Sequence, residues 1–217
     1  MTRILTITLI AVCAWILPAQ GQTVDKGLAS RMDPAGLREL YQICRHTTLS
    51  VRQQEKLAGL LEECSAEFKD ALLGNDGFLT LEDEKRLEKM RDKALRATLS
   101  EAQLLEYFRY LCVPEATRAG HEARDIVSGQ LKLTYMEKKY INNTFYVIAQ
   151  ESGAVRMLYK GQPGRIRSET EKIYEREIEY LRQKSGISVD KDMKATRVLI
   201  INDYAPLTPQ TAENPAK

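Results

Sequence analysis

Apolar residues recur three and four positions apart along most of the chain, the spacing that places them on one side of an α-helix. Several of these stripes are preceded by Ser, Thr or Asp, and some are followed by Gly or Pro, the residues that begin and end helices. The pattern therefore predicts an all-α protein built from antiparallel helical hairpins that form a bundle. Helices are expected over residues 33–45, 50–74, 81–97, 101–112, 134–159 and 166–184, with a weaker and more polar pattern over 115–127.

Two glycine-rich turns each connect two consecutive expected helices. Gly74-Asn75-Asp76-Gly77 separates the second and third helices, and Gly161-Gln162-Pro163-Gly164 separates the last two. The two similar hairpins suggest an internal duplication. The expected organisation is a signal peptide at 1–21, a flexible segment at 22–32, a first helical hairpin region at 33–113, a linker helix at 114–132, a second helical hairpin at 133–185, and an irregular segment with a disordered C-terminal tail at 186–217.

The N-terminus has the pattern of a secretory signal peptide. Arg3 precedes an apolar run over residues 4–17, and Pro18 follows it. Small residues then indicate cleavage before Gln22. The run is short for a transmembrane helix, although its retention as an anchor is the alternative. We therefore expect a periplasmic or secreted protein with no membrane span after cleavage.

The charges are balanced and dispersed. The chain has 32 Lys and Arg residues, 30 Asp and Glu residues and a formal net charge of +2. Without a basic stripe to match a phosphate backbone, nucleic acid is not an expected partner.

Three cysteines, Cys44, Cys64 and Cys112, follow the signal peptide. In an oxidising compartment two of them could form a disulfide and leave one thiol, and the sequence does not say which two. All three also lie in apolar helical patterns, where a free cysteine behaves as a small core residue. Both interpretations stay open.

The sequence contains no recognisable catalytic motif. No nucleophile elbow, zinc-protease motif or phosphate-binding loop occurs. Cys44 and His46 are two potential zinc ligands, but zinc sites in proteins generally need more. The loop at 75–80 has the glycine of a calcium loop without its carboxylates. We therefore predict no enzyme and no catalytic, cofactor or metal site.

A short motif recurs at helix starts: a leucine, then Ser or Thr, then Gln or Glu three residues later. In a capping box, the hydroxyl accepts from the backbone amide three residues on, and the Gln or Glu side chain accepts from the amide of the capping residue. The preceding leucine can pack against the first turn. The three copies are Leu49, Ser50 and Gln53; Leu99, Ser100 and Gln103; and Leu133, Thr134 and Glu137, with a looser version from Leu79 to Asp83.

The two Leu-Ser-x-x-Gln copies, at 49–53 and 99–103 behind a signal peptide, resemble the LTxxQ-motif periplasmic proteins, which include the Spy and CpxP chaperones and stress sensors. The resemblance covers residues 47–111 and extends more faintly over 133–181. It differs by Ser in place of Thr, by a second hairpin and by the lack of a marked basic excess. The resemblance implies an all-helical protein, often a homodimer, whose concave surface holds unfolded clients or contacts a sensor kinase.

Together these features favour a function in binding protein clients or an envelope protein partner. The first hypothesis is a Spy-like chaperone or envelope-stress accessory factor. The alternatives are a structural or scaffold subunit of an envelope assembly, and a metal-responsive sensor that uses the cysteines and His46.

Overall fold

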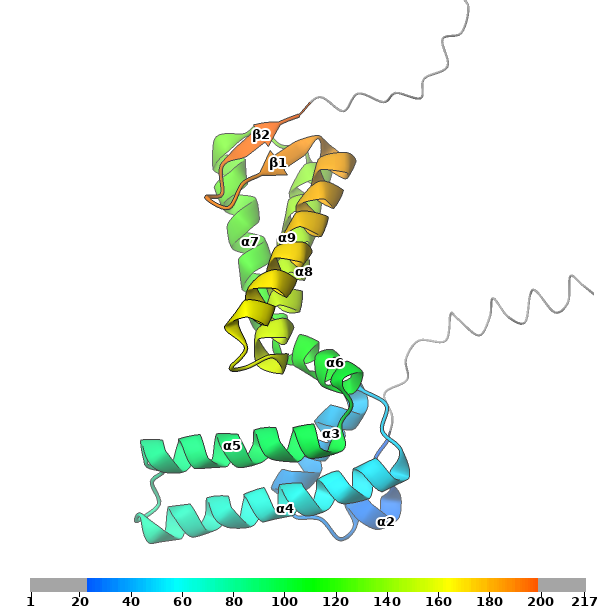
Figure 1. Cartoon of the computed structure of the whole chain (residues 1–217), viewed down its shortest axis with the longest axis vertical. Coiled ribbons are helices and arrows are strands. Elements are labelled where there is room, and N and C mark those ends of the chain that lie inside the picture. The colour runs from blue at the N-terminus through cyan, green and yellow to red at the C-terminus, as the bar shows by residue number, and fades with distance from the viewer. Residues whose placement is uncertain (1–22, 199–217) are drawn as a thin grey trace, which may run out of the picture. The chain divides into compact units, whose positions relative to one another are not determined.

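The computed structural model describes residues 23–198, so the predicted signal peptide and the tail from residue 199 lie outside the described residues. The all-α prediction is confirmed for the described part, which has eight helices and one small two-stranded sheet (Figure 1). The helices are α2 Lys26–Ala29, α3 Pro34–His46, α4 Val51–Gly74, α5 Leu81–Thr98, α6 Glu101–Leu111, α7 Val113–Gln130, α8 Tyr135–Leu158 and α9 Pro163–Ser185; the strands are β1 Ile187–Val189 and β2 Ala195–Arg197.

The chain forms two compact units. The first contains the residues up to Val113 together with Gly153–Ile166, and the second contains Pro114–Ser152 together with the residues from Arg167 on. Helix α8 therefore contributes its first part to the second unit and its last turns to the first. No helix among residues 23–198 is both long and apolar enough to cross a membrane.

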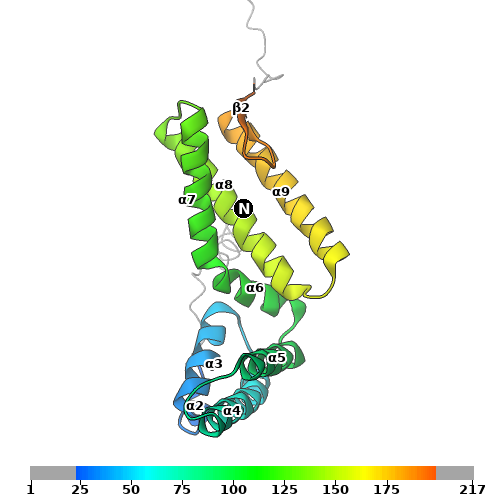
Figure 2. The ribbon, with the colours of Figure 1, turned by 90° about the vertical axis from the view of Figure 1, so that its left-hand side faces the viewer.

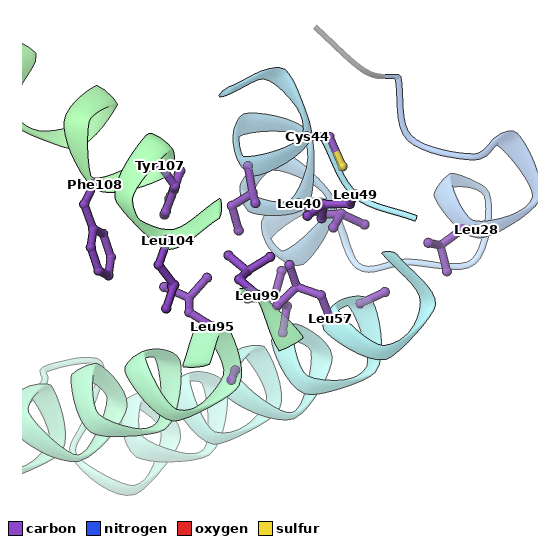
Figure 3. Close-up of a cluster of buried hydrophobic side chains, with 14 of the residues drawn as sticks. Leu28, Leu40, Cys44, Leu49, Leu57, Leu95, Leu99, Leu104, Tyr107 and Phe108 are labelled. Carbon is purple, nitrogen blue, oxygen red and sulfur yellow. The ribbon is translucent and has the colours of Figure 1, made fainter. Parts of the chain in front are cut away.

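In the first unit, α4 and α5 form a long antiparallel hairpin (Figures 1 and 2). Helix α3 packs against α4 and α6, and the apolar stripes of these helices meet in one core. Figure 3 shows leucines of α3, α4, α5 and α6 pointing toward one another there. The motif leucines Leu49 and Leu99 are 1% and 6% exposed, so both are core residues in addition to preceding a cap.

The last turns of α8 are attached to this core by Arg96 of α5. Its guanidinium donates to the backbone oxygens of Met157 at 2.8 Å and Leu158 at 2.9 Å. These carbonyls belong to the last turn of the helix, which has no intrahelical donors for them. Arg96 thus serves as a C-terminal cap supplied by a different helix.

The segment expected to be flexible at 22–32 contains the one-turn helix α2. The Asp25 carboxylate accepts from the backbone amide of Leu28 at 3.0 Å, and Leu28 and Met32 are buried in the first core. A four-residue helix has no apolar period that a sequence pattern could show.

The helix expected at 114–132 as a linker is α7. This helix is part of the second core, because Ala123 and Val127 are buried with Ile141 and Phe145 of α8 and Leu181 of α9. Its inward face consists mainly of small residues, so the mean hydropathy of its sequence is as polar as that of a linker. Small size here allows α7 to approach α8 closely.

The segment from residue 186, expected to be irregular, begins with an antiparallel pair of strands. Ile187 pairs with Arg197, Ser188 with Thr196 and Val189 with Ala195. Ile187 and Val189 are buried in the core of the second unit. Three-residue strands are too short for an alternating pattern to stand out, and their burial against helices gives them their stability.

The approach of α7 to α8 gives a first prediction. A Cβ at Gly120 would lie 2.6 Å from the backbone oxygen of Asn142, which cannot move without displacing α8. We expect Gly120→Ala to destabilise the second unit by about 1–3 kcal/mol, as overpacking does. Gly129→Ala, on the same helix with nothing within 4 Å, is the matched control and should be neutral or slightly stabilising. Equal midpoints of denaturant-induced unfolding for the two variants would contradict the close approach of α7 to α8.

Asp33 gives a second prediction, about acid stability. It caps α3, and its hydrogen bonds from Lys69 and Ser65 of α4 lower its pKa from 3.8 to about 2. Because the folded pKa is the lower one, this stabilisation is present above pH 3.8 and is lost as the pH falls toward 2. Asp33→Asn should therefore lower stability at neutral pH, and its difference from the wild type should shrink between pH 4 and pH 2 in denaturation experiments. A constant difference would contradict this assignment.

Candidate functional site

The capping motifs predicted from the sequence form at the starts of α4 and α6. At α4, the backbone amide of Gln53 donates to Ser50 Oγ at 3.2 Å, and the side-chain oxygen Gln53 Oε1 accepts from the backbone amide of Ser50 at 3.0 Å. At α6, Gln103 and Ser100 make the same two bonds at 3.3 and 2.8 Å. Each glutamine thus satisfies amides that a helix leaves without intrahelical partners.

The structure adds a link between these two caps. Gln53 Nε2 donates to Gln103 Oε1 at 2.9 Å and to the backbone oxygen of Thr98 at 3.0 Å. Gln103 Nε2 donates to the backbone oxygen of Thr48 at 2.6 Å. Each side chain therefore accepts from the capping amide of its own helix and donates to the backbone preceding the other helix, and Gln103 Oε1 also accepts from Gln53. We call Gln53 and Gln103 with these partners the glutamine clasp.

The clasp explains why glutamine occupies both positions. A carboxylate could accept from the capping residue's amide but has no proton to donate to a carbonyl. The third copy of the motif, which has Glu137, shows the difference. Its carboxylate accepts from the Thr134 amide at 2.7 Å and pairs with Arg197 of β2 at 2.6 Å. The hydrogen bond from Arg197 is the main reason that the pKa of Glu137 falls to about 2.

A fourth capping box stabilises the turn between α4 and α5. The buried Asp83 carboxylate accepts from Thr80 Oγ1 at 2.6 Å, from Asn75 Nδ2 at 2.9 Å and from Arg86 at 2.8 Å. Arg86 also pairs with Glu67 of α4 at 2.9 Å. The hydrogen bonds from Thr80 lower the pKa of Asp83. This polar network ties both helices to the turn.

The same turn exposes three large apolar side chains. Leu73, Phe78 and Leu81 are 82%, 75% and 65% exposed. We call these three residues the hairpin tip. Exposed carboxylates of Asp76, Glu82 and Glu84 lie beside it in the sequence. The tip therefore combines apolar and acidic groups on a turn with an internal hydrogen-bond network.

A groove of about 400 Å³ extends the apolar surface along α4, between α3 and α5. It is lined by Phe68 and Cys64 of α4 and by Leu87 of α5 among others, and Phe68 is 42% exposed. An ion pair between Arg91 and Glu39 crosses its lining, and Arg91 also donates to the Tyr107 hydroxyl at 3.2 Å. Neither the groove nor the tip was predicted from the sequence. The only sequence signal for the tip was apolar residues on both sides of a glycine-rich turn.

Cys44 and Cys64 are free thiols on α3 and α4, and Cys112 lies at the C-terminal cap of α6. Cys44 is buried in the first core, and burial raises its pKa to about 11. Burial also raises the pKa of the Cys64 thiol, and Cys112 Sγ lies 4.0 Å from Met157 Sδ. A thiol with a raised pKa is a poor nucleophile at neutral pH because little thiolate is present.

His46 does not join Cys44 in a binding site. Its ring stacks on Tyr110 at a centroid distance of 3.5 Å, and burial lowers its pKa. Within residues 23–198, no three His, Cys, Asp or Glu side chains are grouped as metal ligands would be. The described residues therefore give the sensor hypothesis no site.

Neither a family model nor a curated protein nor a solved structure matches this chain.

The glutamine clasp gives a third prediction. Gln53→Ala and Gln103→Ala should each lower the free energy of unfolding by about 1 kcal/mol or more, because each leaves backbone groups without partners. Their effects should not add, since the two amides share hydrogen bonds, and a coupling of about 0.5–1 kcal/mol is expected from a double-mutant cycle. Gln53→Glu is the matched control, because it keeps the cap and loses the donor. Strict additivity in denaturant titrations would rule the clasp out.

Proposed function

We propose that this protein acts outside the cytoplasm by binding apolar segments of other proteins, as a Spy-like chaperone or an envelope-stress accessory factor. The observation that carries the proposal is the hairpin tip. The proposed location rests on the signal-peptide pattern of residues 1–21, and the proposed chaperone class rests on the two LSxxQ motifs.

Exposed apolar side chains that gather at one place are typical of interaction surfaces, whereas single ones are ordinary. At the tip, Leu73 and Phe78 flank the turn, and Leu81 opens the next helix. The buried Asp83 carboxylate accepts hydrogen bonds from Asn75 and Thr80 of the same turn. Because this network holds the turn, little conformational entropy is lost when a partner covers the tip.

The backbone of the turn supports this display. Asp76 and Gly77 have φ values of 51° and 87°, and the Gly77 amide donates to the backbone oxygen of Leu72 at 2.8 Å. A residue with positive φ after a helix, bonded back to its last turn, reverses the chain sharply. Phe78 follows this reversal directly. The turn geometry thus keeps the phenylalanine away from the interior of the hairpin.

The acidic residues next to the tip indicate which segments it would favour. Asp76, Glu82 and Glu84 would attract Lys and Arg, which commonly flank apolar segments of unfolded chains, and would speed encounter at low salt. The proposed clients are therefore unfolded segments with both apolar and basic residues. The groove beside Phe68 would lengthen the apolar contact along α4.

The fourth prediction tests this surface. The mature protein should suppress aggregation of a chemically unfolded model client at near-stoichiometric ratios, measured by light scattering. Leu73→Ser/Phe78→Ser should raise the concentration needed for half suppression about tenfold, the loss expected when central apolar contacts are removed. Both substitutions are at highly exposed positions, so the helical circular dichroism should not change.

The matched control is Tyr41→Ser/Val51→Ser. These residues are 48% and 59% exposed, and they lie away from the tip on α3 and at the start of α4. This variant should suppress aggregation like the wild type. Equal losses in both variants would refute the tip as the binding surface, and no suppression by the wild type would refute the chaperone proposal. Co-purification of one fixed envelope partner, lost in the tip variant, would favour the scaffold alternative instead.

A further inference from the structure

The second unit contains a groove of about 550 Å³ between α7 and the first part of α8. Figure 2 shows these helices running beside each other. Their approach at Gly120 and Asn142 closes the space beneath the groove. Its lining is polar and comes from both helices: His121, Arg124, Asp125 and Ser128 from α7, and Tyr135, Lys138, Lys139 and Asn142 from α8.

Positive charge dominates this lining. Arg124, Lys138 and Lys139 are cationic, and Asp125 is the one carboxylate among the lining residues. Asp125 is paired with Arg124 at 2.8 Å. Among residues 23–198, the ammonium groups of Lys138 and Lys139 have no hydrogen-bonded or ion-paired partner, although most other cations near α7 and α9 have one. Lys138 and Lys139 therefore line the groove without a hydrogen-bonded or ion-paired partner in that range, and the nearby Asp125 is already paired with Arg124.

Two buried polar atoms of the lining also have no hydrogen-bond partner in the described part of the chain: Ser128 Oγ and Asn142 Oδ1. Buried polar groups without partners are uncommon and costly. A serine hydroxyl can rotate to donate to a ligand, whereas the amide oxygen Oδ1 of Asn142 can only accept. The groove thus holds a neutral hydroxyl donor, Ser128, in addition to its cations.

We propose that this groove binds a phosphate group. A phosphate has several acceptor oxygens and a charge near −2, so it suits a site with several cations and a hydroxyl donor better than a single carboxylate would. Arg124 offers planar donors, and Lys138 and Lys139 supply mobile point charges. This inference does not depend on the proposed client binding, because the hairpin tip belongs to the other unit.

The size of the groove indicates that the phosphate belongs to a larger molecule. Its volume of about 550 Å³ lies within the range of about 300–1,000 Å³ typical of small-molecule sites. Tyr135 at its edge is 80% exposed and could contact the group that the phosphate carries. A soluble phosphate ester and a phospholipid headgroup share this chemistry.

The fifth prediction separates these sources. Calorimetric titration of the mature protein with inorganic phosphate and with glycerol 3-phosphate should show saturable binding if the ligand is soluble. Co-sedimentation with phosphatidylglycerol vesicles but not with phosphatidylcholine vesicles should be seen if the ligand is a headgroup. In either case Lys138→Gln/Lys139→Gln should weaken binding about tenfold or more, the loss expected for charge-assisted hydrogen bonds.

Lys132→Gln/Lys194→Gln is the matched control. It removes the same charge from exposed positions of the same unit that do not line the groove. The control should bind like the wild type, and Lys138→Arg/Lys139→Arg should retain most of the binding. Unchanged circular dichroism of every variant shows that folding is not the cause.

Three results would overturn the assignment. The first is an absence of saturable binding to phosphate, glycerol 3-phosphate and both vesicles. The second is an equal loss in the groove variant and its control, which would indicate attraction by net charge alone. The third is tighter binding of polyglutamate than of any phosphate compound, which would indicate an acidic protein partner instead.

Discussion

The hydrogen bonds between Gln53 and Gln103 hold together the two places where the chain of the first unit changes direction before a helix. Each glutamine caps its own helix and donates to the backbone before the other, so the two helix starts form one polar cluster. Beside this cluster, Leu49 and Leu99 enter the same core. One short motif thus provides an apolar contact, a cap and a crosslink. The directions of α4 and α6, and with them the position of the hairpin, depend on that combination.

At the clasp, apolar leucines are buried beside polar glutamines. At the far end of the α4–α5 hairpin, a polar residue is buried and apolar side chains are exposed. Asp83 is buried and accepts hydrogen bonds from Thr80, Asn75 and Arg86, whereas Leu73, Phe78 and Leu81 are exposed. A turn whose own polar groups are satisfied internally does not need water around it, so covering it costs little desolvation of polar groups. The clasp and the tip therefore have complementary roles: one holds the hairpin at its base, and the other presents apolar surface at its end.

The second unit is held together by different kinds of contact. Its helices approach through small residues at Gly120 and Ala123, and Arg197 of β2 is attached to the start of α8 through Glu137. Close helix packing leaves little room for large side chains between α7 and α8, so the long cationic side chains project from the flanks of the contact. That is the origin of the basic groove. It forms although the chain as a whole has nearly balanced charge, because the one carboxylate of the lining, Asp125, is already paired with Arg124.

The sequence by itself determined the helices from α3 on, the turns between the long ones and the capping boxes, because these depend on residues at most four positions apart. It did not reveal the role of α7, since a helix with small core residues and a linker have a similar mean hydropathy. Nor did it reveal the strands at 187–189 and 195–197, which are too short to show a period. The motif residues Ser50, Gln53, Ser100 and Gln103 were found as separate caps. Their crosslink, the exposed tip and the basic groove were decided only by the tertiary structure, because each depends on side chains that the fold brings together or leaves uncovered.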